Sequence, residues 1–208
     1  MRRPLFLFVH GWAGTPALWD PVRAALAARG VAAADMRVDF HAGVTAASRP
    51  VIGIGHSLGA ARLLVQGPVL AGFVAINGFT RFSAAPDFPA GTHPRVLSTM
   101  RRRLLADAGA VLADFHARAG LPLPPGPYEA EALAQGLDLL GTIDARAAFG
   151  DFASPHAALC GSDDAIVPPA HAAACFADPV MVAGAGHGLP VSHPDLCADH
   201  ILRLAARC

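Results

Sequence analysis

A serine between two glycines is the group in this chain best suited to covalent chemistry. Residues 55–59 read Gly-His-Ser-Leu-Gly, a G-x-S-x-G pattern centred on Ser57. The apolar residues 50–54 before it favour a strand, and residues 60–65 after it favour a helix. A serine on such a tight strand-to-helix turn projects its hydroxyl from the carboxyl end of a sheet, and only small residues fit beside it. The pattern therefore predicts a nucleophilic serine.

A serine hydroxyl is a weak nucleophile, so it needs a base and a group that orients the base. Asp163 and Asp164 follow the apolar residues 157–160, and His187 follows the apolar residues 180–182 in a glycine-rich segment. An acid on a loop that leaves a strand is well placed to accept a histidine N–H. We expect His187 to be the base and one of the two aspartates to be its partner.

The chain has ten histidines, so His187 must be distinguished from the others. His56 belongs to the serine turn itself and lies too close in sequence to be the base, while His193 starts the last predicted helix, where a structural role is expected. No His/Cys cluster has the spacing of zinc ligands, so we predict no metal and no cofactor. We expect the following histidines to be surface or capping residues: His41, His93, His116, His156, His171 and His200.

A hydrolytic serine also needs donors for the negative oxygen that forms when it attacks a carbonyl. One predicted donor is the backbone N–H of Leu58, the residue after the nucleophile. The apolar residues 5–9 form a strand of the type buried in parallel sheets, and His10, Gly11 and Trp12 follow it. The backbone N–H of Trp12 is the predicted second donor, and Gly11 lets the backbone approach closely.

Composition indicates a globular chain without affinity for nucleic acid. Of the 208 residues, 53% are hydrophobic and only 15% are charged, which excludes disorder. The formal net charge is zero, and the one basic run is Arg101, Arg102 and Arg103, so nucleic acid is not an expected partner. No apolar stretch is long enough to span a membrane, and the one near the N-terminus is too short for a signal peptide. The four scattered cysteines favour free thiols and a cytoplasmic location. We expect a monomer.

Strand and helix patterns alternate as in a parallel α/β fold, with one interruption. Strands are predicted over 4–9, 33–39, 50–55, 70–77, 156–160 and 179–183, and helices over 16–29, 57–66 and 194–206. Between about 80 and 148 the alternation stops, and helical patterns appear over 95–118 and 129–140. We therefore predict a core formed by residues 1–79 and 149–208, with residues 80–148 inserted as a helical lid.

These motifs resemble the pimeloyl-[acyl-carrier protein] methyl ester esterases of biotin synthesis, within the α/β-hydrolase superfamily. The order Ser, Asp, His along the chain is that of the superfamily. The start of the lid and the segment from His187 to Pro194 are more specific to the esterases. The similar blocks are His10–Trp12 with Trp19, the serine turn, 82–97, 136–146, 161–168 and 185–194.

The resemblance implies roles for individual residues. By position, Asp164 and not Asp163 matches the family's acid, and Trp19, Phe82 and Phe115 fall near positions that line its acyl pocket. Three features depart from the family pattern. The residue before the serine is His56 in place of tryptophan, the chain is shorter at its N-terminus, and the lid arginines at 101–103 do not align with those that engage the carrier protein.

The expected activity is hydrolysis of an acyl methyl ester by a Ser57–His187–Asp164 triad, on a small-molecule or carrier-linked substrate, with Arg101–Arg103 as a possible contact for acyl-carrier protein. Apolar lid residues at helical spacing predict a narrow apolar pocket with these arginines outside it. Three alternatives stay open: a lyase of menaquinone synthesis with a similar triad, a general small-ester hydrolase or thioesterase, and a non-catalytic scaffold of the same fold.

Overall fold

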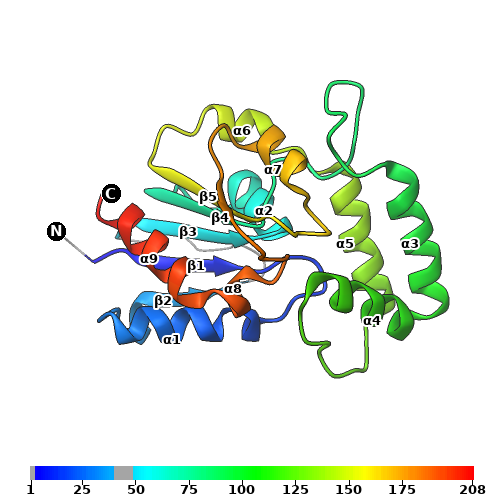
Figure 1. Ribbon diagram of the computed structural model, residues 1–208, viewed down its shortest axis with the longest axis horizontal. Coiled ribbons are helices and arrows are strands. Elements are labelled where there is room, and N and C mark those ends of the chain that lie inside the picture. Colours follow the sequence, from blue (N-terminus) through cyan, green and yellow to red (C-terminus); the bar gives the residue numbers. More distant parts are fainter. Residues whose placement is uncertain (1–2, 40–48) are drawn as a thin grey trace.

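The computed structural model describes residues 3–39 and 49–208, and within them six parallel strands form one sheet in the order β2-β1-β3-β4-β5-β6 (Figure 1). Every neighbouring pair is parallel. This confirms the predicted α/β architecture. The strands are β1 (Leu5–Val9), β2 (Met36–Val38), β3 (Val51–His56), β4 (Gly72–Ile76), β5 (His156–Gly161) and β6 (Val180–Val182).

The central strands are apolar throughout because both faces of the sheet are covered. Along β1, Phe6 and Phe8 join one buried cluster, whereas Leu7 and Val9 join another, as expected when successive side chains point to opposite faces. The first cluster is covered by α1 (Asp20–Ala28) and α9 (Pro194–Ala205), and the second is covered by α2 (Leu58–Gln66).

The observed elements refine the predicted ones mainly at their ends. The helix predicted over 16–29 is a 3₁₀ turn, Pro16–Trp19, followed by α1, and the strand predicted over 33–39 begins with a 3₁₀ turn before β2. The sequence analysis missed two short helices on the loops after β5 and β6. They are α7 (Pro169–Cys175) and α8 (Leu189–Ser192).

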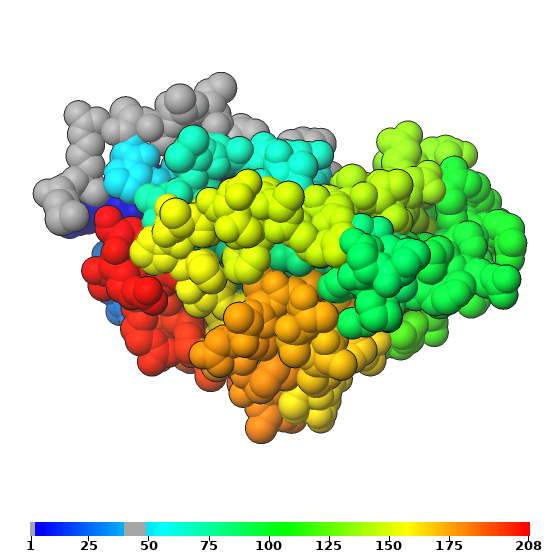
Figure 2. Space-filling view, turned by 90° about the horizontal axis from the view of Figure 1, so that it is seen from above, coloured from blue at the N-terminus to red at the C-terminus, as the bar shows by residue number. Residues whose placement is uncertain are grey.

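The predicted lid consists mainly of three helices that lie beyond the carboxyl ends of the strands (Figure 1). They are α3 (Pro94–Ala106), α4 (Ala108–Ala119) and α5 (Ala130–Thr142). The helical pattern over 95–118 is broken at Asp107, whose backbone is extended and whose carboxylate accepts the N–H of Ala110 at 2.9 Å. Figure 2 shows this segment, in green, at the end of the molecule opposite the red C-terminal helix.

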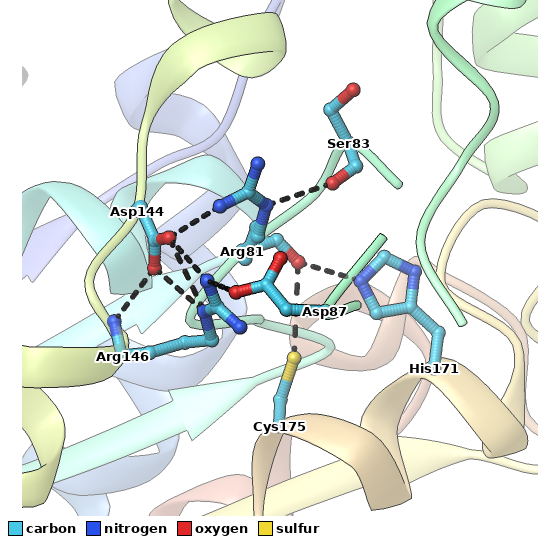
Figure 3. A network of polar contacts seen from close by, with 7 residues as sticks. All are labelled: Arg81, Ser83, Asp87, Asp144, Arg146, His171 and Cys175. Atoms are coloured by element: carbon cyan, nitrogen blue, oxygen red, sulfur yellow. Dashed lines mark hydrogen bonds and ion pairs between the residues drawn. The ribbon is translucent and has the colours of Figure 1, made fainter. Parts of the chain in front are cut away.

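A polar network joins the two chain segments that enter and leave the lid (Figure 3). Arg81, shortly after β4, forms an ion pair with Asp144, which precedes α6 (Arg146–Gly150). Arg146 binds Asp144 and also Asp87, with its nitrogen 2.7 Å from each carboxylate. On the other side, His171 of α7 donates to the carbonyl oxygen of Arg81 at 2.7 Å. The two ends of the lid are thus tied together near the boundaries that the sequence predicts.

None of the helices in the described ranges is long and apolar enough to cross a membrane. The four cysteines are free thiols, three of them buried.

Candidate active site

Ser57 occupies a strained turn between β3 and α2. Its φ and ψ angles are 53° and −126°, a backbone conformation that residues with a side chain rarely adopt. The flanking glycines are required by packing, since a Cβ at Gly55 would lie 2.4 Å from Ala60 and one at Gly59 would lie 2.1 Å from the carbonyl oxygen of Val9. This is the geometry of a nucleophile elbow.

The loops after β5 and β6 bring Asp164 and His187 together. Oδ2 of Asp164 accepts a hydrogen bond from Nδ1 of His187 at 2.8 Å, and both side chains are buried. Oδ1 of Asp164 accepts the backbone N–H groups of Ile166 and Val167, each at 2.8 Å. Asp163 is exposed and binds the hydroxyl of its neighbour Ser162. Of the two candidate aspartates, Asp164 is therefore the one paired with the histidine.

These contacts keep Asp164 ionised and define the tautomer of His187. Burial raises the pKa of the Asp164 carboxyl, but the hydrogen bonds from His187 and the two backbone N–H groups outweigh it and hold that pKa below its usual value. Because a carboxylate only accepts, Nδ1 of His187 carries the hydrogen and neutral His187 has its lone pair at Nε2. This Nε2 is buried and has no hydrogen-bond partner within the described residues.

Ser57 lies in the same region but forms no hydrogen bond with His187 in the part of the chain that the structure describes. The residue before Ser57 packs against the histidine, since the ring centroids of His56 and His187 are 4.7 Å apart. Hydrogen bonds between nucleophile and base are often long before substrate binds.

The segment after β1 also approaches the nucleophile. A Cβ at Gly11 would lie only 2.7 Å from Cβ of Ser57, so the backbone of residues 10–12 passes directly beside the serine. Among the described residues, neither the N–H of Trp12 nor that of Leu58 has a backbone or side-chain acceptor. Both predicted oxyanion donors are therefore without an acceptor in the part of the chain that the structure describes.

A cavity of about 490 Å³ opens at Ser57 beneath the lid. Its apolar wall includes Phe82 from the entry to the lid, Phe115 from α4 and the ring of Trp12. The rings of Trp12 and Phe115 meet edge to face at 4.8 Å, and the indole N–H of Trp12 donates to the carbonyl oxygen of Leu133 at 2.8 Å. Two of the three residues that the resemblance assigns to the acyl pocket, Phe82 and Phe115, line this cavity.

Trp19, the third of those residues, does not line the cavity. It is fully buried on the other face of the sheet, in the cluster beneath α1 and α9, with its ring 5.2 Å from that of Phe8. The 3₁₀ turn that ends at Trp19 directs the indole into the core. The structure thus places Trp19 in the core and not at the cavity.

The lid arginines are arranged differently from the prediction. Arg103 does not lie outside the pocket but lines the cavity, as do Arg118 and Arg95, the last of which the sequence analysis did not select. Arg101 does not line it and pairs with Asp138 on α5 at 3.0 Å, and Arg102 hydrogen-bonds to Thr99 within its own helix. The three consecutive arginines diverge because successive residues of a helix point about 100° apart.

The remaining histidines follow the prediction in part. His156 is exposed and His93 caps α3 by accepting the N–H of Arg95, whereas His41 lies outside the described residues. His116 and His171 are buried and not at the surface, because each donates to a backbone carbonyl: Ala13 for His116 and Arg81 for His171.

The sequence analysis missed one polar residue at the centre of the site. Asn77 directly follows β4 and donates from Nδ2 to Oδ2 of Asp164 at 2.6 Å. Its place after a buried strand, like that of Asp164 after β5, is the signal that points to it. Nowhere in the described ranges do three or more His, Cys, Asp or Glu side chains gather as they would around a metal ion.

Comparison with known proteins places these features in a family context. The model of a family described as "Alpha/beta hydrolase family" matches residues 6–200. The chain is similar to two proteins named pimeloyl-[acyl-carrier protein] methyl ester esterase. One, from Stenotrophomonas maltophilia, is 28% identical over 99% of this chain and 94% of its own length. The other, from Xanthomonas oryzae pv. oryzae, is 30% identical over 78% of this chain and 74% of its own length.

Solved structures show the same fold at lower identity. A bromoperoxidase from Bacillus anthracis superposes with a TM-score of 0.76 at 17% identity, covering 99% of this chain and 92% of its own. An esterase from Exiguobacterium antarcticum gives a TM-score of 0.75 at 14% identity, with the same coverage. At these identities the likeness concerns the fold alone.

Proposed function

Because this chain belongs to the alpha/beta hydrolase family, we propose that it is a serine carboxylesterase that cleaves an acyl ester through an acyl-enzyme on Ser57. One observation carries the proposal. Ser57 stands on a strained turn at a largely apolar cavity, and the buried Asp164–His187 pair near it leaves Nε2 of the histidine without a partner among the described residues.

In the proposed mechanism, His187 Nε2 takes the proton of Ser57 as the serine oxygen attacks the ester carbonyl. Asp164 stabilises the imidazolium and keeps the hydrogen at Nδ1. The N–H groups of Trp12 and Leu58 bind the negative oxygen of the tetrahedral intermediate. The imidazolium then protonates the leaving alcohol, and water, activated by His187, releases the acid from Ser57. The reaction needs no cofactor.

We propose that the substrate is a pimeloyl-type methyl ester linked to acyl-carrier protein. The names of the curated relatives support this, as does the shape of the cavity. Phe82, Phe115, Leu97 and other apolar residues form walls that suit an extended acyl chain. The methyl ester would lie at Ser57, and the chain would run toward the lid.

The rim of the cavity supports the carrier-linked form of the substrate. Arg95, Arg103 and Arg118 are exposed at the lid, with Asp114 as the acidic residue among the cavity-lining side chains. The guanidinium groups of Arg95 and Arg103 have no hydrogen bond or ion pair within the described residues. They can therefore bind a phosphate or an acidic protein surface, as guanidinium groups commonly do. The four free thiols are consistent with a cytoplasmic enzyme.

The test uses the purified protein with the methyl ester of pimeloyl-carrier protein and, separately, a p-nitrophenyl short-chain ester. We expect wild type to release methanol and free acid from the first substrate, and to rescue a biotin auxotroph that lacks its pimeloyl ester esterase. Ser57→Ala should lower kcat on both substrates by about 10⁶. Hydrolysis by Ser57→Ala near the wild-type rate would contradict the proposal. If product analysis shows elimination from a menaquinone precursor and no ester hydrolysis, the lyase alternative replaces it.

A further inference from the structure

The loop that carries His187 is held by side chains from the ends of two adjacent strands. His56 is the last residue of β3 and lies beside Ile76, the last residue of β4, in the parallel ladder, and Asn77 follows immediately. Nε2 of His56 is 2.9 Å from the carbonyl oxygen of His187, and Nδ2 of Asn77 is 3.3 Å from that of Gly186. Two consecutive carbonyl groups of the loop are thus each bound by one side chain.

The partner of His56 determines where its hydrogen is. A carbonyl oxygen only accepts, so Nε2 of His56 is the donor and Nδ1 carries the lone pair. Nδ1 is buried and has no hydrogen-bond partner within the described residues. Burial, and then the nearby charge of His187, lower the pKa of His56 to about 3, with Asp164 acting in the opposite direction and His10 in the same direction as His187. His56 is therefore a neutral donor, and its ring lies between the rings of His187 and Trp19.

The orientation of the Asn77 side chain is also determined by its surroundings. It is fully buried and has a φ of 47°, in the left-handed region that asparagine tolerates better than most residues. Both groups facing its amide nitrogen, Oδ2 of Asp164 and the carbonyl oxygen of Gly186, are acceptors, so the NH₂ end must point toward them. Its Oδ1 has no hydrogen-bond partner among the described residues. The side chain of Asn77 thus leaves one buried acceptor unsatisfied, while its amide nitrogen binds both Asp164 and the loop that carries His187.

We propose that His56 and Asn77 are positioning residues for the catalytic base: His56 fixes the backbone of His187, and Asn77 fixes both the Asp164 carboxylate and the backbone of Gly186. The assignment rests on the proposed function and deepens it. Neither residue lines the cavity at Ser57, so neither is expected to contact substrate.

Loss of either donor should act on the reaction and not on substrate binding. Without His56 the carbonyl of His187 is left buried and unpaired, so the loop shifts to find another donor. A displacement of about 1 Å at a catalytic group can cost about 100-fold in rate. Without Asn77, Oδ2 of Asp164 has one donor fewer and its negative charge acts more strongly on the imidazolium. The acid limb of the activity profile should then lie at higher pH.

The test measures how fast a serine-reactive fluorophosphonate labels Ser57, as a function of pH, because this readout does not depend on the natural substrate. The His56→Leu variant should label up to about 100-fold more slowly than wild type. In the matched His56→Gln variant, the side-chain amide supplies an N–H near the position of Nε2, and labelling should stay close to the wild-type rate. Asn77→Gly tolerates the left-handed backbone and should move the acid limb of the pH profile to higher pH. Thermal unfolding of each variant identifies those that are folded.

The outcomes separate this inference from the proposed function. If wild type is labelled at Ser57 but folded His56→Leu matches it, or the acid limb of Asn77→Gly does not move, the positioning roles are contradicted and the proposed function stands. A purely structural role would slow labelling equally at every pH and would not be restored by glutamine. If wild type itself is not labelled at Ser57, the proposed function is contradicted and the positioning roles with it.

Discussion

The carboxyl edge of the sheet and the lid above it hold their polar side chains in opposite ways. At the edge, His56, Asn77, Asp164 and His187 are all at most 3% exposed, and each makes a hydrogen bond to another residue of the group. On the lid, Arg95 and Arg103 are exposed and make no hydrogen bond or ion pair to the described residues. One region is constrained by its own chain, and the other is available to a partner.

The difference suggests a division of roles between the two regions. Buried, mutually bonded groups keep a fixed geometry, which is what proton transfer requires. Exposed guanidinium groups on long side chains adapt to an anionic surface and mainly affect encounter and affinity. Substitutions at the edge should therefore change kcat, and substitutions on the lid should change KM.

The largest expected effect separates the two adjacent aspartates at the edge. Asp164→Asn should lower kcat by about 10⁴, because asparagine cannot hold the tautomer of His187 or stabilise its charge. Asp163→Asn is the matched control and should cost little, since the carboxylate of Asp163 is exposed and, among the described residues, accepts a hydrogen bond only from the hydroxyl of Ser162. Steady-state kinetics on a p-nitrophenyl ester measures both variants. Equal losses of kcat in the two variants would contradict the assignment of Asp164 as the partner of His187.

A second effect concerns stability and arises from the burial of His56 at the edge. The pKa of His56 is lowered from 6.5 to about 3, so between these pH values the unfolded chain binds a proton that the folded chain does not. The contribution of His56 to stability is therefore fully present above pH 6.5 and is lost as the pH falls toward 3. From pH 7 to pH 5, His56 accounts for a loss of about 2 kcal/mol in the free energy of unfolding.

Urea unfolding at the two pH values measures this loss. His56→Gln should show a smaller decrease than wild type by about that amount. A lid variant such as Arg103→Gln should keep the wild-type decrease. The prediction fails if His56→Gln and wild type lose the same free energy.

On the lid, reversing the charge of Arg95 and Arg103 to glutamate should raise KM for the carrier-linked ester roughly ten-fold, which is about 1.4 kcal/mol. The KM for a small p-nitrophenyl ester should stay the same. Arg102→Glu is the matched control, because Arg102 lies on the same helix but does not line the cavity. If both substrates respond alike, the arginines act through folding of the lid, and the carrier-protein part of the proposal is contradicted.

The smallest effect is expected at the junction between the two regions. Asp144→Asn removes the carboxylate that binds both Arg81 and Arg146, so it should lower Tm by a few degrees while leaving kcat well below Tm unchanged. Asp138→Asn, which removes only the exposed pair with Arg101, should have less effect. Differential scanning calorimetry of the two variants decides whether the junction stabilises the fold more than a single surface pair does.

The sequence was sufficient to predict the strands of the sheet and to select Ser57, Asp164 and His187, which the structure brings to its carboxyl edge. Continuous apolar runs identify the parallel strands, and the polar residues that follow them, including Ser57 and Asp164, lie at the edge where those strands end. Asn77 follows the same rule after β4, but the strand predicted over 70–77 included it, whereas β4 ends at Ile76.

Features that depend on contacts between distant segments could not be predicted from such sequence patterns. Trp19 faces the core because of the turn before α1, and His116 and His171 are buried because loops distant in sequence offer them carbonyl groups. The split of the long lid helix at Asp107 depends on one side-chain cap. The arginine run could be located on a helix, but which of its members faces the cavity depends on how that helix packs.

The central claim is that Ser57 forms a covalent acyl-enzyme, and the most direct measurement is its trapping. Wild type is mixed with a p-nitrophenyl ester, quenched with acid within the first turnover and digested for mass spectrometry. We predict a burst of p-nitrophenol and an acyl group on the peptide that contains Ser57, with neither in Ser57→Ala. Steady hydrolysis by wild type without an acylated peptide, or with the acyl group on another residue, would contradict the account.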